Sequence, residues 1–154
     1  MDVSMTPQEI ESFLSEKNLA RIATVRPNGA PHVTPVWYIW ENNELLIPII
    51  RGSVKESNIR QNSKVAATID SDTSPHRAVI VEGTARIEGE LRGEIEMRFY
   101  RRYLKPEDVE RYLEFVHATS ETLLIRVHPK RITSWDYSRD AYHMQKEQAR
   151  KGNQ

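Results

Sequence analysis

The segment from Arg51 to Asn58, with the sequence RGSVKESN, holds the residues of this chain that are best placed to do chemistry. It brings Gly52, Ser53 and Lys55 to a point where a predicted strand enters a predicted helix. Free backbone N–H groups and the positive end of the helix dipole favour an anion at such a junction. Because the Lys55 ammonium adds a full positive charge, the pattern indicates a phosphate-binding site.

The same segment has a second interpretation. Ser53 followed by Glu56 matches a capping box, in which the serine oxygen and the glutamate carboxylate each accept a hydrogen bond from the backbone at the helix start. A capped helix needs no ligand. The segment alone therefore leaves both a phosphate site and an ordinary helix start open.

Composition narrows the class of protein. The chain has 154 residues, a formal net charge of zero and no cysteine. The neutral charge gives no broad attraction to nucleic acid or anionic lipid, and the lack of cysteine excludes a disulfide scaffold and a thiol nucleophile. The amino terminus lacks a signal-peptide pattern, and no apolar run approaches the ~20 residues that cross a bilayer. We expect a cytoplasmic protein with no membrane or nucleic-acid partner.

Up to residue 70, the apolar spacing and the turn-forming residues predict mainly strands. Thr6-Pro7 predicts the start of a short first helix, and Asn28-Gly29 predicts a hairpin turn because it accepts a positive φ. Pro31 and Pro35 lack an N–H donor and predict an edge strand or a bulge. The predicted strands cover residues 19–25, 32–40, 45–50 and 64–70, with a turn at 41–44 and a helix over about 54–61.

The second half of the chain combines long strands with a pair of helices. The alternation over residues 77–90 predicts a long strand that is bent or bulged near Gly83. Apolar spacing then predicts two short helices on either side of Pro106. Strands are predicted over 122–127 and 131–136, with a break at His128-Pro129. The polar tail, about 138–154, is predicted to be a frayed helix or disordered.

These elements predict a mainly β fold with short helices, built as a single domain over residues 1–154 with its core at about 6–136. Six or seven strands with hairpin connections favour an antiparallel barrel, because regular alternation of strands and helices is lacking. Closure of the sheet into a barrel also removes exposed strand edges.

Four blocks of sequence resemble proteins of the pyridoxamine 5'-phosphate oxidase-like family. They are LARIATV (19–25), PNGAPHVTPVWY (27–38), GSVKESNIRQNSKVA (52–66) and VEGTA (81–85), in the order and spacing typical of the family. The resemblance covers roughly residues 6–136. It implies a split antiparallel β-barrel of the FMN-binding type that forms a homodimer. It also implies two cofactors in clefts at the subunit interface, each with its phosphate on the strand-to-helix junction.

The resemblance implies roles for individual residues. Ser53 and Lys55 match phosphate-binding positions, His32 falls near a position where many relatives place a basic group, and the segment from Thr34 to Val36 matches the one beside the cofactor ring. Arg131 and Trp135 lie in a segment that passes near the partner subunit's cofactor in relatives. The predicted cofactor-binding residues are His32, Thr34, Pro35, Val36, Ile49, Ile50, Arg51, Ser53, Val54, Lys55, Arg77, Arg131 and Trp135.

Two positions depart from the family pattern. Relatives commonly have an arginine at the position of Val54 and a threonine or another polar residue at the position of Pro48. These departures predict a weaker hold on the phosphate. Arg51 and Arg77 are candidates to compensate, because a guanidinium offers two parallel hydrogen bonds to phosphate.

The chemistry of such a site belongs mainly to its cofactor, so no catalytic residue is assigned from the sequence. The five histidines show no metal-ligand spacing, and no metal is predicted. The region from Arg131 to Tyr137 lacks the arginine and histidine motif of true pyridoxamine phosphate oxidases, which argues against oxidation of vitamin B6.

We therefore expect an oxidoreductase that uses FMN, or alternatively a deazaflavin coenzyme, and transfers hydride or electrons to or from a small organic substrate. One alternative is a non-catalytic flavin- or haem-binding protein for storage or sensing, which the departures at Pro48 and Val54 favour. Another is a small barrel that binds single-stranded nucleic acid, which the neutral charge argues against.

Overall fold

The computed structural model describes residues 2–151, which form a mainly β fold. The strands are β1 (Ala20–Val25), β2 (Pro31–Val36), β3 (Ile39–Glu41), β4 (Glu44–Ile50), β5 (Lys64–Asp70), β6 (Arg77–Glu90) and β7 (Thr122–Asp136). The helices are α1 (Pro7–Ser15), α2 (Val54–Gln61), α3 (Glu94–Tyr103), α4 (Val109–Thr119) and α5 (Ala141–Lys151), with 3₁₀ turns η1 (Pro106–Asp108) and η2 (Tyr137–Arg139).

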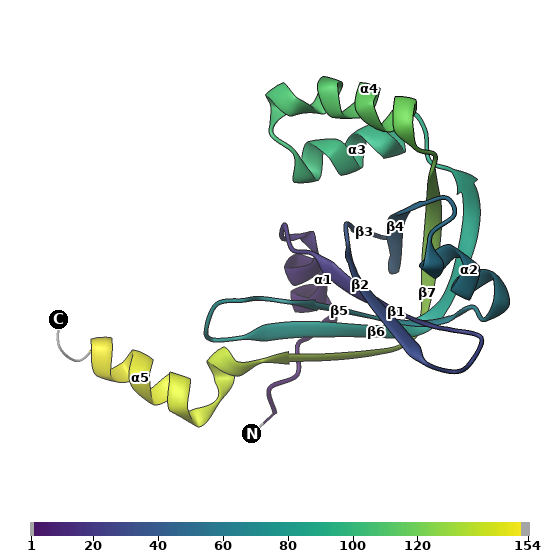
Figure 1. The fold of residues 1–154 in the computed structure, drawn as a ribbon. Helices are drawn as coiled ribbons and strands as arrows, with labels where there is room; N and C mark the ends of the chain where they lie inside the picture. Colours follow the sequence, from purple (N-terminus) through teal and green to yellow (C-terminus); the bar gives the residue numbers. More distant parts are fainter. Residues whose placement is uncertain (1, 152–154) are drawn as a thin grey trace.

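The strands of residues 2–151 form one sheet in the order β2-β1-β5-β6-β7-β4-β3, and each neighbouring pair is antiparallel (Figure 1). This confirms the predicted mainly β class and the antiparallel arrangement of the strands. The two turns predicted from asparagine and glycine are also confirmed. Gly29 has a φ of 83° at the β1–β2 turn, and Asn42 and Asn43 have positive φ between β3 and β4.

The predicted strand over residues 32–40 is wrong as a single element. β2 ends at Val36 and β3 begins at Ile39, so Trp37 and Tyr38 leave the sheet. The Tyr38 N–H donates to the Tyr103 hydroxyl at 3.1 Å, and the Tyr38 hydroxyl donates to the Leu14 carbonyl at 2.9 Å. Because side chain and helix partners satisfy these polar groups, the chain can bend here without a strand partner.

The predicted break at His128-Pro129 is also wrong, since β7 runs without interruption from Thr122 to Asp136. The pairing of β6 with β7 shifts its register between Glu82 and Gly83, which confirms the predicted irregularity near Gly83. A Cβ atom at Gly83 would lie 2.0 Å from the His128 carbonyl oxygen. The glycine therefore allows the backbones of β6 and β7 to approach closely. The proline is accommodated at a bulge in β7.

Two hydrophobic cores lie on opposite faces of β4 and β7. Leu45, Ile47 and Ile125 point into the larger core, which also contains residues of α1, α2, β1, β5 and β6. Leu46 and Leu124 point the other way, into a smaller core shared with α3 and α4. Burial on both faces explains why β4 and the beginning of β7, from Leu123 to Ile125, are continuous apolar runs rather than alternating ones.

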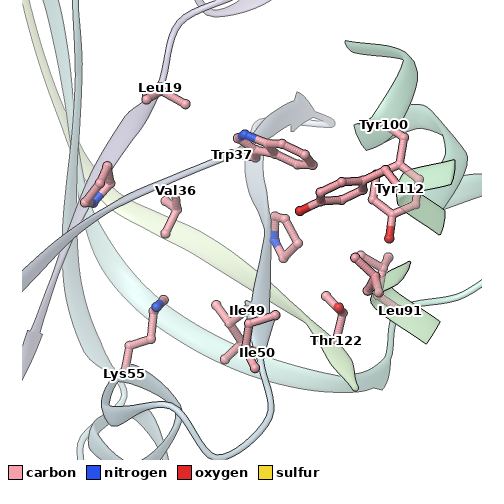
Figure 2. A pocket seen from close by; sticks show the side chains of 13 residues that line it. Leu19, Val36, Trp37, Ile49, Ile50, Lys55, Leu91, Tyr100, Tyr112 and Thr122 are labelled. Atoms are coloured by element: carbon pink, nitrogen blue, oxygen red, sulfur yellow. The ribbon is translucent and has the colours of Figure 1, made fainter. Parts of the chain in front are cut away.

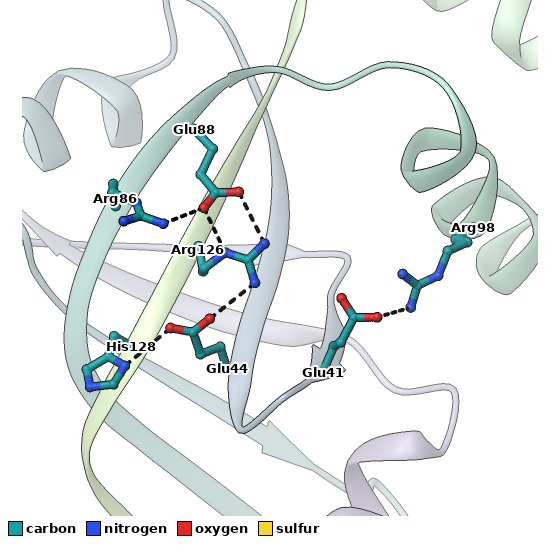
Figure 3. Close-up of polar contacts among 7 residues, drawn as sticks. All are labelled: Glu41, Glu44, Arg86, Glu88, Arg98, Arg126 and His128. Atoms are coloured by element: carbon teal, nitrogen blue, oxygen red, sulfur yellow. Dashed lines mark hydrogen bonds and ion pairs between the residues drawn. The ribbon is translucent and has the colours of Figure 1, made fainter.

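We call α3, η1 and α4 (residues 94–119) the helical arm. Figure 1 shows its two α-helices side by side beyond the end of the sheet where β4 and β7 lie. Arg102 on α3 donates to the carbonyls of Leu14 and Glu16 at the end of α1, at 3.3 and 2.6 Å. It thereby satisfies carbonyls that the helix leaves free. Arg98 forms an ion pair with Glu41 of β3 at 2.9 Å, so the arm is also fixed to the sheet (Figure 3).

A cross-strand ion-pair network covers the outer surface of β4, β7 and β6. Arg126 of β7 contacts Glu44 of β4 at 3.1 Å and Glu88 of β6 at 2.7 Å (Figure 3). Opposite charges on neighbouring strands stabilise the pairing of those strands. The network therefore reinforces the pairing of β6, β7 and β4, the strands next to the helical arm.

The C-terminal tail, for which the sequence left a helix or disorder open, is helical up to Lys151. Its last three residues lie outside the described residues. α5 buries none of its side chains and projects away from the sheet (Figure 1). Among the described helices, none is long and apolar enough to cross a membrane.

Candidate functional site

A cavity of about 390 Å³ lies between the strands and the helical arm, within the range of small-molecule sites (Figure 2). Lys55 is the one charged side chain that lines it among residues 2–151, and most of the others are apolar or aromatic. The lining residues are Leu19, Pro35, Val36, Trp37, Pro48, Ile49, Ile50, Lys55, Leu91, Tyr100, Tyr112, Val116 and Thr122.

One side of the cavity, which we call the strand wall, consists of Pro35 and Val36 of β2 and the segment from Pro48 to Ile50 of β4. Ile49 is buried, whereas Ile50 remains half exposed at the end of its strand. Pro48 contributes an apolar ring, so the strand wall is entirely apolar. Such a surface suits the flat ring of an organic cofactor better than a charged group.

The Lys55 side chain extends over the strand wall from the start of α2 (Figure 2). It has no ion pair or hydrogen-bond partner among residues 2–151, and desolvation lowers the pKa of its ammonium below the ordinary 10.5. The neighbouring Arg51 and Arg60, by contrast, are paired with carboxylates. An ammonium held in a largely apolar cavity without a counterion favours an anionic ligand.

The start of α2 is capped from within the chain. The Ser53 hydroxyl accepts from the Glu56 N–H at 3.4 Å, and the Glu56 carboxylate accepts from the Gly52 N–H at 2.6 Å. The Gly52 hydrogen bond and then Arg60 hold the pKa of Glu56 below its ordinary range. The serine cap is therefore confirmed, whereas the Glu56 carboxylate accepts from the Gly52 N–H and not from the Ser53 N–H of a complete capping box. At this junction the Lys55 side chain, rather than the Gly52 N–H, is available to an anion.

The opposite side of the cavity, which we call the helical wall, is aromatic. It comprises Trp37 together with Tyr100 of α3 and Tyr112 of α4. Trp37 stacks on Tyr103, with ring centroids 5.0 Å apart and planes within 5°, and Tyr100 meets Tyr112 edge to face at 5.2 Å. The Tyr103 hydroxyl donates to the Asn18 carbonyl at 2.7 Å, which fixes the stack to the segment before β1.

A buried carboxylate supports the helical wall from behind. Glu96 is 2% exposed and accepts a hydrogen bond from the Tyr100 hydroxyl at 2.8 Å. His117 Nε2 of α4 lies 2.9 Å from the same carboxylate, which ties the two helices together. Burial and the neighbouring Glu96 carboxylate raise the pKa of the Tyr100 hydroxyl above its ordinary value. The Tyr100 hydroxyl is therefore neutral, and its hydrogen bond to Glu96 is already formed.

Of the predicted site residues, the structure brings five to this cavity. Two others, His32 and Thr34, lie on one face of β2, and His32 pairs with Thr24, which accepts from Asn58 of α2 at 2.9 Å. The His32 Nδ1 and Thr34 Oγ1 atoms are buried and have no hydrogen-bond partner among residues 2–151. The five that line the cavity are Pro35, Val36, Ile49, Ile50 and Lys55.

The two arginines predicted to compensate at the phosphate are engaged elsewhere. Arg51 Nε lies 2.5 Å from Glu121, and the Arg77 guanidinium forms two hydrogen bonds to Glu16, at 2.8 and 2.9 Å. Arg77 also covers the Phe13 ring, 4.8 Å from its centroid. Neither guanidinium lines the cavity or is free for a phosphate, so the compensation hypothesis is not supported by this geometry.

The remaining predicted residues lie outside the cavity of their own chain. Val54 is an exposed apolar residue at the start of α2. Arg131 and Trp135 lie on the half of β7 remote from Thr122, opposite Glu82 and Ala78 of β6. Their role beside a partner subunit's cofactor stays a prediction.

Sequence reasoning missed Tyr100 and Tyr112. Both belong to amphipathic helices whose apolar spacing was recognised, but spacing along a helix does not show which strand the helix will face. The signal in the sequence was the number of tyrosines on those helices. Within residues 2–151, no group of three or more metal-ligating side chains is arranged to hold a metal ion.

Residues 6–136 match the protein family described as pyridoxamine 5'-phosphate oxidase. The chain belongs to this family. The site residues fit the kind of cofactor that the family resemblance implies, because an apolar wall for a flat ring lies beside an unpaired ammonium for a phosphate. The resemblance seen in four blocks of sequence is thus confirmed.

Several individual proteins are similar to this chain over most of its length. A 5a,11a-dehydrotetracycline/5a,11a-dehydrooxytetracycline reductase from Streptomyces rimosus is 29% identical over 143 residues, which are 88% of this chain and 85% of that protein. The crystal structure of a conserved hypothetical protein from Mycobacterium tuberculosis matches with a TM-score of 0.70 and 26% identity, over 88% of both chains. An F420 reductase matches with a TM-score of 0.63 and 26% identity, over 79% of this chain and 94% of its own.

Proposed function

We propose that the protein is an oxidoreductase that binds a flavin, FMN in the first instance, or a deazaflavin coenzyme. It transfers hydride or electrons to or from a small organic substrate. The observation that carries the proposal is the unpaired Lys55 ammonium beside the apolar strand wall, in a chain of this family. Two relatives support it, since one is named as a 5a,11a-dehydrotetracycline reductase and the other as an F420 reductase.

Different residues of the site would hold different parts of such a coenzyme. Lys55 would hold the phosphate, and Val36 and Ile49 would lie against the ring. When bound, the coenzyme supplies the redox chemistry, and the protein supplies orientation and exclusion of water. FMN and a deazaflavin coenzyme share a flat ring and a phosphate, so this part of the site accepts either.

We also propose that the sheet forms the split barrel typical of the family and that two copies of the chain share the site. Exposed apolar side chains on and beside β2 and β4 support a subunit interface, since Val33 is 59% and Ile50 48% exposed. In such a dimer, Arg131 and Trp135 would reach the partner's coenzyme. Sedimentation at micromolar concentration should give about twice the chain mass of 17.9 kDa. A monomer that binds flavin fully would contradict the shared site.

Titration of the purified protein with FMN, riboflavin and a deazaflavin coenzyme tests the proposal. Absorbance and fluorescence changes should report saturable binding of FMN or the deazaflavin, and riboflavin, which lacks the phosphate, should bind more weakly. A bound coenzyme that accepts and returns electrons supports the oxidoreductase, whereas one that stays inert supports a storage or sensing protein. A haem band with no flavin binding would contradict the proposal.

A further inference from the structure

The two tyrosines of the helical wall differ in how their hydroxyls are used. The Tyr100 hydroxyl points back along α3 and donates to Glu96 at 2.8 Å. The Tyr112 side chain reaches across the cavity toward Trp37, with its hydroxyl at the cavity end (Figure 2). No hydrogen bond to the Tyr112 hydroxyl is formed by any side chain or backbone group of residues 2–151. Tyr112 therefore presents a free donor to whatever occupies this half of the cavity.

The surroundings of that hydroxyl restrict the kind of molecule it can meet. Trp37 is held by its stack on Tyr103, and Tyr100 is held by its edge-to-face contact with Tyr112, so the walls are flat and fixed. Lys55, the one charged residue that lines the cavity among residues 2–151, extends from α2 over the strand wall on the other side. An uncharged, planar molecule fits the helical wall, and the Tyr112 hydroxyl can donate a hydrogen bond to an acceptor atom on it.

We propose that the helical wall is the substrate half of the site, and that it binds a planar, conjugated carbonyl compound whose oxygen accepts a hydrogen bond from Tyr112. This inference rests on the proposed function, which assigns the strand wall and Lys55 to the coenzyme. A hydrogen bond to the carbonyl fixes the orientation of the substrate and draws electron density from its conjugated system. Tyr112 thus determines which flat molecules bind and how they lie.

The test measures binding of two bicyclic probes to FMN-saturated protein by equilibrium dialysis. Coumarin is a flat conjugated carbonyl compound, and naphthalene has the same ring size without an oxygen. Tyr112→Phe keeps the aromatic wall and removes only the hydroxyl. It should lower the affinity for coumarin about three- to tenfold, which is the effect of one neutral hydrogen bond. The affinity for naphthalene should change by less than about twofold.

Tyr100→Phe is the matched control, because it removes a hydroxyl on the same wall that is already bonded to Glu96. It should lower stability without changing the ratio of the coumarin and naphthalene affinities. Thr122→Val tests the other hydroxyl that lines the cavity, and it too should leave the ratio unchanged. An unchanged ratio in Tyr112→Phe, or an equal change in either control, would overturn the inference.

The FMN affinity of each variant separates this inference from the proposed function. Tyr112→Phe should bind FMN as the unmodified chain does. A fall in FMN affinity as large as the fall for coumarin would place Tyr112 in the coenzyme half and overturn the inference while leaving the proposed function intact. Failure of the unmodified chain to bind either coenzyme would instead contradict the proposed function.

Discussion

The two walls of the cavity are built in different ways. The strand wall is part of the sheet, where backbone pairing of β4 with β7 sets the positions of Pro48 and Ile49. The helical wall is held by side chains: Glu96 links its two helices, and Arg102 and Tyr103 fix it to the segment after α1. The strand wall is therefore defined by backbone pairing within the sheet, and the helical wall by a few side-chain contacts.

This difference suggests that the two halves of the site can be altered separately. Substitutions in the helical arm should change which molecules bind beside the aromatic rings. Substitution of Lys55 should change the affinity for the anionic end of the coenzyme. The following variants test whether the walls are independent in this way.

The largest effect is expected from Phe99→Ala in the smaller core. Phe99 is fully buried between the helical arm and the sheet. Loss of this ring should lower the free energy of unfolding by about 3–5 kcal/mol in urea titrations. Protein that stays folded should lose coumarin binding but still prefer FMN over riboflavin. Phe99→Leu provides a milder version if the alanine variant does not fold. Loss of the FMN preference in folded protein would show that the walls are not independent.

Lys55→Gln should act on the other wall. Removal of the ammonium should weaken FMN by about 1.5–3 kcal/mol, roughly ten- to a hundredfold, because a charge-assisted contact to the phosphate is lost. Riboflavin titrations should barely change, and so should coumarin binding. Arg51→Gln is the matched control, since the Arg51 charge is already paired with Glu121. Equal losses for FMN and riboflavin would place Lys55 away from the phosphate.

The titration of Lys55 gives a pH dependence with a defined sign. Desolvation lowers its pKa in the folded chain below 10.5. FMN affinity should therefore fall as the pH rises through that lowered pKa, because the neutral amine no longer attracts the phosphate. The ligand-free protein should gain stability over the same range, since the cost of holding the charge out of water disappears. Lys55→Arg should keep FMN affinity constant there, and a matching alkaline decline in that variant would assign the effect to another group.

The smallest effect is expected from Glu96→Gln. The amide can still accept from the Tyr100 hydroxyl, but the charge facing His117 is lost. We expect a loss of about 1 kcal/mol in stability and a modest weakening of coumarin, without change in FMN affinity. Glu94→Gln, on the same turn of α3 but exposed and paired with Arg101, should have a smaller effect. A larger loss in Glu94→Gln than in Glu96→Gln would contradict a supporting role for the buried carboxylate.

The sequence by itself determined most of the elements and the position of one cation of the site. Local turn chemistry at Asn28-Gly29 and alternation in residues 77–90 predicted the strands, and the spacing from Gly52 to Lys55 predicted where a cation would face a ligand. Such features depend on residues close together along the chain, so they can be recognised without a structure.

Only the tertiary structure decided which charges are free and what faces Lys55 across the cavity. Arg51 and Lys55 are both cations beside the start of the predicted helix. The pairing of β4 with β7 brings Glu121 next to Arg51, so the Arg51 charge is paired and the Lys55 charge is not. Tyr112 became part of the site because Glu96 and Arg102 fix the helical arm over β4. The spacing of residues along one helix fixes its apolar face but not the partner of that face, and that partner is chosen by long-range packing.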